Sequence, residues 1–303
     1  MSVRIFEGTN HANLYSRFRP TVPDEVIAEV LRFLEGRIPS DKWDIAVDVG
    51  CGSGQGTNKL SKFFDSCYGY DVSRAQINEA QVVNHSHNVY YDVSPAESLP
   101  NIGTDSVQLV TAFTAAHWFD LQAFFSETDR ILVNNGVVAL ICYLLPGPDP
   151  IDPLNPTDKR LIKLMSESYY DPRLAPYKNP KIVSTEIHYN DFRFPNHYDF
   201  VHKDNIVVSK TTFAHELVGY YQSWSLYQGL VLKDKPLADQ CLQEFIAKLK
   251  DILKTDDLYT KEITYCMPIT AIEAKTGPTP AIAANPTTTP CPLCGRNFLP
   301  ERL

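Results

Sequence analysis

The sequence predicts an α/β protein built on a mostly parallel sheet, with helices on both faces and a helical cap. Three observations support this class. Apolar runs alternate with helical stretches from residue 43 to about 145, alternating glycines follow the first run, and a proline-rich segment then interrupts the pattern. Strands that alternate with helices are typical of a parallel sheet wrapped by helices.

The segment ahead of the alternating block predicts one amphipathic helix. Residues 21–34 (TVPDEVIAEVLRFL) carry acidic side chains in the first turn and apolar side chains at Val26, Val30, Phe33 and Leu34. Acidic residues favour a helix start, and this apolar spacing gives a single buried face.

The alternating block predicts five strands in sequence. They are DIAVDVG, CYGYDVS, NVYYDVS, SVQLVTAF and GVVALICYLL. Helical patterns lie between them in NKLSKFF, AQINEAQVV and LQAFFSETDRIL. We expect these segments to form the core of a ligand-binding domain, over about residues 43–145.

The second half predicts a cap and a late strand. PGPDPIDPLNP is too rich in proline to continue the sheet. Residues 157–170 and 213–250 look helical and are expected to cap the sheet edge, whereas 263–275 reads as a strand. We therefore expect one domain over 1–275, with cap and late strands over about 146–275. Residues 276–303 are rich in Pro, Thr and Ala and predict a disordered tail.

Composition limits the partners. The chain has 303 residues, 44% of them hydrophobic, and a formal net charge of −8, which disfavours a nucleic-acid phosphate backbone as a partner. Neither a signal peptide nor a membrane-spanning apolar run is evident. We expect a cytoplasmic protein that binds a small molecule, neither nucleic acid nor membrane, with its seven cysteines reduced. The oligomeric state is not predicted.

The glycine loop carries the most specific signal. Asp48 lies near the end of the first strand, and Gly50, Gly52 and Gly54 follow at every second position before a helix. Such glycines permit a sharp turn and close approach of a ligand, and the helix N-terminus offers N–H groups to an anion. A tight turn without a ligand is the plainer alternative.

Two nucleotide motifs fit this loop poorly. A dinucleotide fingerprint that starts at Gly50 needs glycine where Gln55 stands, and no lysine follows as in a phosphate-binding loop.

Asp71 ends the next strand, about 20 residues downstream, where Rossmann-like sheets place an acid that accepts hydrogen bonds from ribose hydroxyls. Capping of the following helix is the alternative role for Asp71, although Ser73 could provide that cap.

Later segments of the sequence resemble a known protein family. Together with the loop, Ala96-Glu97-Ser98-Leu99-Pro100 resembles class I S-adenosylmethionine-dependent methyltransferases of the methyltransferase domain 11 type. FEGTNHANLYSRFRPTVP, AAHWFD and LVGYYQSWSLYQ are similar to the group of trans-aconitate and cantharidin methyltransferases. The resemblance covers the chain to about residue 275. It implies a Rossmann-like seven-stranded fold, methyltransferase activity and S-adenosylmethionine as the cofactor.

The resemblance also implies roles for individual residues. The glycines would line the methionine moiety, Asp48 would orient its amino group, Asp71 would hold the ribose, and the segment from Thr114 would face the methyl group. Pro95 stands where many relatives have an aspartate that receives the adenine amino group, which leaves backbone groups or Glu97 for that contact. The expected cofactor residues are Asp48, Gly50, Cys51, Gly52, Gly54, Asp71, Val72, Ala96, Glu97 and Thr114.

The sequence gives fewer signals for the residues that would bind the methyl acceptor. Methyl transfer mainly requires alignment, and a carboxylate acceptor is already ionised at pH 7, so no catalytic triad is needed. Arg17 or Arg19, beside Tyr15, could grip a carboxylate, and His117 could act as a base toward a hydroxyl. Solvated arginines and a structural His117 are the alternatives. We take His117, Arg19 and Tyr15 as the candidate catalytic residues.

The sequence thus predicts a small-molecule methyltransferase that acts on a carboxylate or hydroxyl of an organic acid. RNA or protein methylation, or a non-catalytic scaffold, are the rival hypotheses. An aromatic set in the cap, Tyr220, Tyr221, Trp224 and Tyr227, could line a substrate pocket or form helix core. Cys291 and Cys294 form only half of a zinc knuckle, so no metal is expected.

Overall fold

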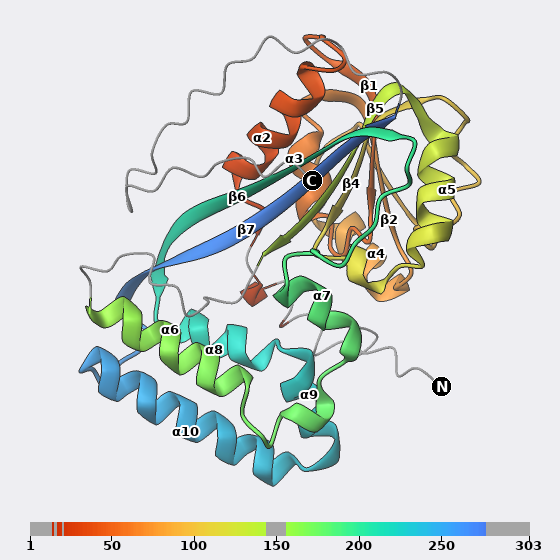
Figure 1. The fold of residues 1–303 in the computed structure, drawn as a ribbon. Helices are drawn as coiled ribbons and strands as arrows, with labels where there is room; N and C mark the ends of the chain where they lie inside the picture. The colour runs from red at the N-terminus through yellow and green to blue at the C-terminus, as the bar shows by residue number, and fades with distance from the viewer. Residues whose placement is uncertain (1–13, 15–16, 20, 144–155, 277–303) are drawn as a thin grey trace.

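One sheet of seven strands runs through the computed structural model, which describes residues 14, 17–19, 21–143 and 156–276 (Figure 1). Its order is β3-β2-β1-β4-β5-β7-β6. The strands are β1 (Trp43–Val49), β2 (Phe64–Asp71), β3 (Val89–Val93), β4 (Val107–Phe113), β5 (Leu132–Tyr143), β6 (Tyr198–Phe213) and β7 (Glu262–Thr276).

The strand directions confirm the predicted fold class. Strands β1 to β5 pair in parallel, and β7 lies antiparallel between β5 and β6. The strand order reverses between β1 and β4. In sheets of this kind, ligands bind at the carboxyl ends of the strands beside that reversal. The expected site residues at the ends of β1, β2 and β4 therefore lie at the same edge.

Helices cover both faces of the sheet. The helices α2 (Asp24–Glu35), α3 (Gln55–Leu60) and α4 (Arg74–Val83) share a buried cluster on one face, and α5 (Leu121–Ile131) packs on the other. The predicted N-terminal helix is confirmed as α2, which starts after Pro23 and buries Val26, Val30 and Leu34.

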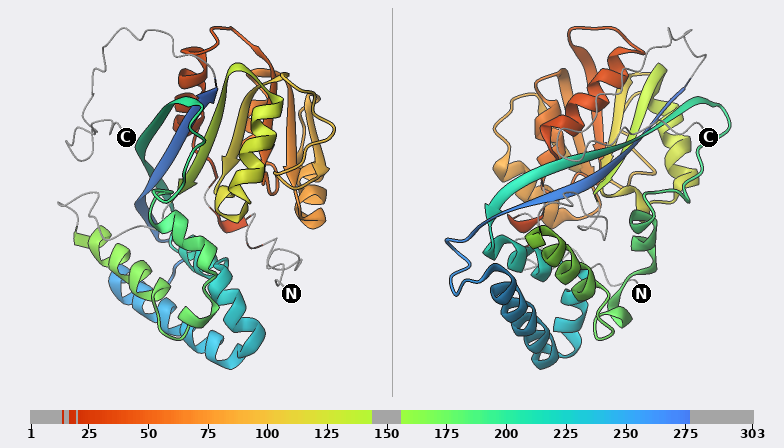
Figure 2. Two further views of the ribbon diagram at one scale, coloured as in Figure 1. Left: turned by 45° about the vertical axis from the view of Figure 1, so that its right-hand side comes forward. Right: turned by 60° about the vertical axis from the view of Figure 1, so that its left-hand side comes forward.

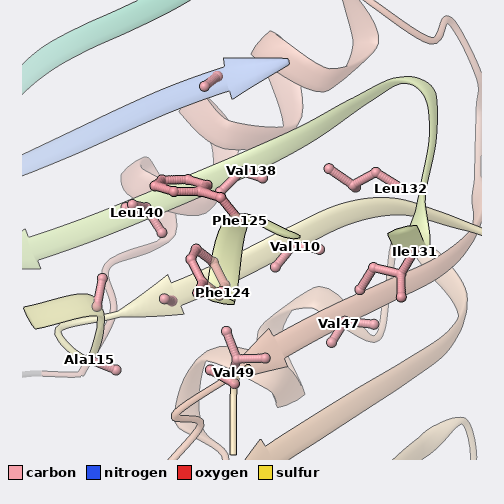
Figure 3. Close-up of a cluster of buried hydrophobic side chains, with 14 of the residues drawn as sticks. Val47, Val49, Val110, Ala115, Phe124, Phe125, Ile131, Leu132, Val138 and Leu140 are labelled. Atoms are coloured by element: carbon pink, nitrogen blue, oxygen red, sulfur yellow. The ribbon is translucent and has the colours of Figure 1, made fainter. Parts of the chain in front are cut away.

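Alternation along the strands explains how one sheet serves two cores. In β1, Ala46 belongs to the cluster with α2, whereas Val47 and Val49 belong to the cluster with α5 (Figure 3). In β5, Val138 and Leu140 likewise join Phe124 and Phe125 of α5, while their neighbours in the strand face the opposite layer. Side chains of a strand point alternately to its two faces, so a doubly covered strand is apolar throughout.

The second half forms a helical cap with a core of its own. Its helices are α6 (Pro156–Tyr169), η2 (Ala175–Tyr177), η3 (Pro180–Ile182), α7 (Val183–Glu186), α8 (His215–Gln222), α9 (Ser225–Lys233) and α10 (Lys235–Leu253). The group of α6, α8, α9 and α10 lies beyond one end of the sheet (Figure 2). A third buried cluster joins these four helices. Asp234 caps α10 by accepting a hydrogen bond from the Leu237 N–H.

The cap aromatics Tyr220, Tyr221, Trp224 and Tyr227 belong to the buried core of the cap. Trp224 is 1% exposed and contacts Tyr169, Tyr220 and Tyr221 through their rings. Tyr221 also stacks on Phe245 of α10. The helix-core alternative from the sequence therefore holds for this set.

Strands β6 and β7 connect the sheet to the cap. They pair along almost their whole lengths and extend beyond the sheet as a two-stranded ribbon (Figure 2). The Ala214 N–H donates to the Lys261 carbonyl where this ribbon meets α8.

Among the residues that the structure describes, no helix is long and apolar enough to cross a membrane. The described cysteines Cys51, Cys67, Cys142 and Cys241 are free thiols.

Candidate active site

The glycine loop between β1 and α3 has three residues in the left-handed region. The φ angles are 64° at Gly50, 54° at Gly52 and 81° at Gly54. A Cβ at Gly50 would lie 2.4 Å from the Ala115 Cβ, and one at Gly54 would lie 2.2 Å from the Tyr91 hydroxyl. Protein thus fills the space beside these two glycines.

Gly52 differs from the other two glycines. A Cβ there would meet nothing closer than the Gln76 side chain at 3.8 Å. The loop therefore leaves open space beside Gly52, where a ligand can approach the backbone.

Asp71 joins the end of β2 to this loop. Its carboxylate accepts a hydrogen bond from the Gly52 N–H at 3.0 Å and another from the Ser73 N–H at 2.8 Å. Burial raises the pKa of Asp71, and these two backbone hydrogen bonds oppose the rise. Ser73 is the N-cap of α4 and accepts from the Gln76 N–H. Capping of α4 thus falls to Ser73, as the sequence suggested, and Asp71 lies beside the open part of the loop.

Asp48 is buried behind the loop. It accepts hydrogen bonds from the Thr57 hydroxyl at 2.6 Å and the Thr111 hydroxyl at 2.9 Å, and it is 1% exposed. Burial raises its pKa to about 7 against these two hydrogen bonds. The carboxylate therefore ties β1 to α3 and β4, and it holds the loop in place from within the protein.

The expected adenine-side residues lie at the ends of β2 and β3. Val72 follows Asp71 and is 60% exposed. Ala96 is buried in the core on the α5 face. The Glu97 carboxylate accepts a hydrogen bond from the Asp120 N–H at 2.7 Å, which ties this loop to the start of α5.

Thr114 marks the exit of β4. Its φ is 56°, a left-handed value that a threonine adopts only where its surroundings enforce it. Its N–H donates to the Ile141 carbonyl at 2.6 Å. The chain then turns so that Ala115 covers Gly50 and the short helix η1 (Ala116–Trp118) presents His117.

His117 is nearly enclosed. It is 8% exposed, and its Nδ1 lies 3.1 Å from the Tyr189 hydroxyl oxygen. Burial, with the positive charges of Lys181 and Arg19, lowers the pKa of His117 to about 3. The imidazole is therefore neutral throughout the physiological range.

Arg19 connects the N-terminal segment to the sheet and the cap. Its guanidinium donates to the Tyr143 hydroxyl oxygen at 3.0 Å and to the Ser223 carbonyl at 3.2 Å, and it lies over the Tyr220 ring. Arg17 is exposed and lies over the Phe18 ring. Tyr15, like Cys291 and Cys294, lies outside the described residues. The charge of Arg19 acts on His117, so these two candidates belong to one region.

Sequence reasoning missed three residues of this region. Tyr143 binds Arg19, Tyr189 binds His117, and the Lys181 ammonium donates to the Trp118 carbonyl at 2.7 Å. Tyr143 is the last residue of β5 and lies near the end of the predicted strand GVVALICYLL, a position that could have drawn attention to it. Lys181 lies in the short helix η3 and Tyr189 lies in the turn after α7, and neither belongs to a local motif.

The loop and Asp71 fit the predicted cofactor. The open side of Gly52 admits close contact, Asp71 offers carboxylate oxygens, and exposed Val72 offers an apolar surface for a base. The Cys51 thiol donates to the Gly52 carbonyl at 3.6 Å, and burial raises the pKa of this thiol. Among the described residues, no cluster of His, Cys, Asp or Glu could hold a metal ion.

Comparisons with known proteins identify the family. The methyltransferase domain model of the type predicted above matches residues 47–140. A Dictyostelium discoideum protein, provisionally named as a methyltransferase, is 31% identical over 86% of this chain and 91% of its own length. A Saccharomyces cerevisiae protein, whose name assigns it provisionally to the S-adenosylmethionine-dependent methyltransferases, is 23% identical over 80% of this chain and 88% of its own.

A solved structure agrees with this assignment. It is provisionally titled a type II methyltransferase of Anaeromyxobacter dehalogenans and superposes with a TM-score of 0.66. The two chains are 27% identical, over 86% of this chain and 98% of the other. The chain therefore belongs to the class I S-adenosylmethionine-dependent methyltransferases, and it is an enzyme of that class with S-adenosylmethionine as its cofactor.

Proposed function

We propose that the enzyme methylates an oxygen of a small organic acid, at a carboxylate or a hydroxyl group. One observation carries the proposal: Lys181 donates to the Trp118 carbonyl next to His117, and the positive charges of both Lys181 and Arg19 act on His117, beyond the carboxyl end of β4. Cationic and N–H groups in a partly desolvated site favour an anionic acceptor. The resemblance to trans-aconitate and cantharidin methyltransferases supports the same substrate class.

The low pKa of His117 favours the carboxylate over the hydroxyl. The bound S-adenosylmethionine supplies an electrophilic methyl group. A carboxylate acceptor is ionised at pH 7 and needs no proton removed, whereas a hydroxyl acceptor needs a base. An imidazole whose pKa is about 3 is a weak base, but it can still donate a hydrogen bond that orients an oxygen.

In this proposal one set of residues binds the cofactor and another set binds the methyl acceptor. Asp71, Val72 and the loop around Gly52 would hold the cofactor, while Arg19 and His117 would align the acceptor oxygen. Alignment of nucleophile and electrophile supplies most of the acceleration in such a displacement. The cap would exclude water, which strengthens these electrostatic interactions. We further propose a cytoplasmic enzyme whose partner is a small metabolite.

A labelling experiment tests the proposal. The enzyme would be incubated with methyl-labelled S-adenosylmethionine and three acceptor pools: a metabolite extract, total RNA and total protein. We expect label in small acids, and we expect mild alkali to release it, because esters hydrolyse and ethers do not. The Asp71→Ala variant is the matched control for background. Label found in RNA or protein, or alkali-stable label, would contradict ester formation on a small acid.

A further inference from the structure

Tyr189 contacts His117 from a distant part of the chain. The phenol oxygen lies 3.1 Å from Nδ1, and 72 positions separate the two residues in sequence. Both side chains are buried, at 1% exposure for Tyr189 and 8% for His117. No activity described so far uses this contact.

The backbone that carries Tyr189 is held in a strained form. His188 and Tyr189 have φ angles of 58° and 56°, two successive left-handed values without a glycine. Such residues persist only where surrounding contacts enforce them, and they often lie at functional sites.

Several contacts enforce this form. The Tyr189 N–H donates to the Ser184 carbonyl at 2.7 Å, and the Tyr189 ring stacks on Phe192 at 4.3 Å between centroids. On the other side, Nδ1 of His188 lies 2.8 Å from the hydroxyl oxygen of Thr270, a fully buried residue of β7. The phenol is therefore fixed relative to the sheet.

The chemistry of the pair sets the direction of its hydrogen bond. The imidazole of His117 is neutral, so one ring nitrogen carries a hydrogen and the other has a free lone pair. A phenol is a stronger acid than a neutral imidazole N–H, and an imidazole nitrogen is a stronger base than a phenol oxygen. The Tyr189 hydroxyl thus donates to Nδ1, which leaves the hydrogen of His117 on Nε2.

We propose that Tyr189 is a positioning residue that fixes His117 as its Nε2–H tautomer, a hydrogen-bond donor for an anionic acceptor oxygen. The inference rests on the proposed function for the acceptor, but the tautomer itself is a property of the protein alone. The positive charges of Arg19 and Lys181 support the same outcome, because they disfavour a second proton on the ring.

The tautomer can be measured without any substrate. Nitrogen NMR of histidine-labelled protein would distinguish the two neutral forms, with the His117 signal assigned from the His117→Gln variant. We expect the Nε2–H form in the wild type and a mixture of both forms in Tyr189→Phe. Tyr198→Phe is the matched control, since Tyr198 is also buried on the α5 face and its hydroxyl lies near Thr128. A wild-type Nδ1–H form, or unchanged signals in Tyr189→Phe, would overturn the proposal.

Kinetics with an identified acid acceptor provide the second test. Tyr189→Phe should lower kcat about tenfold and leave the KM for S-adenosylmethionine unchanged, since one oriented neutral hydrogen bond is lost. His117→Gln should retain more activity than His117→Asn, because a glutamine amide nitrogen reaches the Nε2 position and an asparagine amide nitrogen reaches the Nδ1 position. Equal loss in Gln and Asn variants would contradict a donor role.

The two tests separate the inference from the proposed function. If the NMR result holds and no acid is methylated, the tautomer assignment stands and the acceptor class is wrong. If acids are methylated and Tyr189→Phe changes neither the signals nor kcat, the acceptor class stands and the positioning role is wrong. A folding defect in Tyr189→Phe would appear in a thermal melt. In that case, the activity of His117→Gln compared with that of His117→Asn tests whether His117 donates from Nε2.

Discussion

The carboxylate of Asp71 accepts a hydrogen bond from the N–H of Gly52, 3.0 Å away. This contact joins the end of β2 to the most open position of the glycine loop. The acid and the backbone that would face the cofactor are therefore held as one unit, and cofactor affinity is expected to depend on both.

Removing the Asp71 carboxylate should weaken cofactor binding. In Asp71→Ala the ribose hydroxyls would lose their acceptor and Gly52 its restraint, for a loss of about 1–3 kcal/mol in binding free energy. Isothermal titration with S-adenosylmethionine measures this loss. Asp92→Ala is the matched control, because Asp92 is exposed near the end of the adjacent strand β3. An unchanged affinity in Asp71→Ala would remove Asp71 from the site.

The loop glycines should respond differently to alanine. Gly54→Ala drives a Cβ into the Tyr91 hydroxyl and should lower the free energy of unfolding by more than about 2 kcal/mol. In Gly52→Ala the added Cβ meets open space. The free energy of unfolding should fall only by the penalty for a left-handed alanine, about 1–2 kcal/mol. The added methyl group should, however, obstruct the cofactor. Thermal melts with and without S-adenosylmethionine compare the two variants. A ligand-induced shift of wild-type size in Gly52→Ala would contradict close approach of the cofactor.

Asp48 should make stability depend on pH. Its pKa is about 7 in the folded state against a usual 3.8, so between these values the folded protein holds a proton that the unfolded chain has lost. Stability therefore falls as pH rises through this window and levels off above it. Asp48→Asn removes this dependence. Urea denaturation between about pH 4 and 7 measures the free energy of unfolding of both proteins. The value for Asp48→Asn minus the value for the wild type should grow as the pH rises. A difference that stays constant with pH would contradict the raised pKa of Asp48.

Arg19 should matter to the acceptor more than to the cofactor. Arg19→Ala removes the guanidinium, and kcat/KM for an acid substrate should fall by about 100-fold while cofactor affinity stays near wild type. Arg19→Lys should restore the activity only in part, because it lacks the planar fork. Arg17→Ala is the matched control, since Arg17 is exposed. Wild-type kinetics in Arg19→Ala would exclude it as an anchor.

The rate should not depend on titration of His117 in the neutral range. With its pKa at about 3, the imidazole keeps one charge state above about pH 5. A pH profile of kcat/KM for a carboxylate acceptor is therefore expected to be flat from about pH 6 to 9. A limb near pH 6.5 that disappears in His117→Gln would show that the imidazole titrates normally and would favour a hydroxyl acceptor.

Much of the fold and the cofactor side could be predicted from sequence, because the signals there are local. Periodicity distinguishes strand from helix over a few residues, and the glycines from 50 to 54 precede a helix within the same loop. Asp71 ends the next strand, and parallel strands bring their carboxyl ends to one edge. Ser73 could likewise be identified as the cap of α4 from its position alone.

The acceptor side depends on contacts between distant segments, which no local pattern encodes. Arg19 reaches Tyr143 across 124 positions and His117 meets Tyr189 across 72. The pKa of His117 follows from burial and from two cations, so its chemical role could not be deduced from residue type. Sequence by itself determined a doubly covered sheet with a cofactor loop, since backbone propensity and apolar periodicity act locally. Tertiary structure alone decided that His117 is neutral and that Trp224 is core, because desolvation and packing depend on what surrounds a side chain in space.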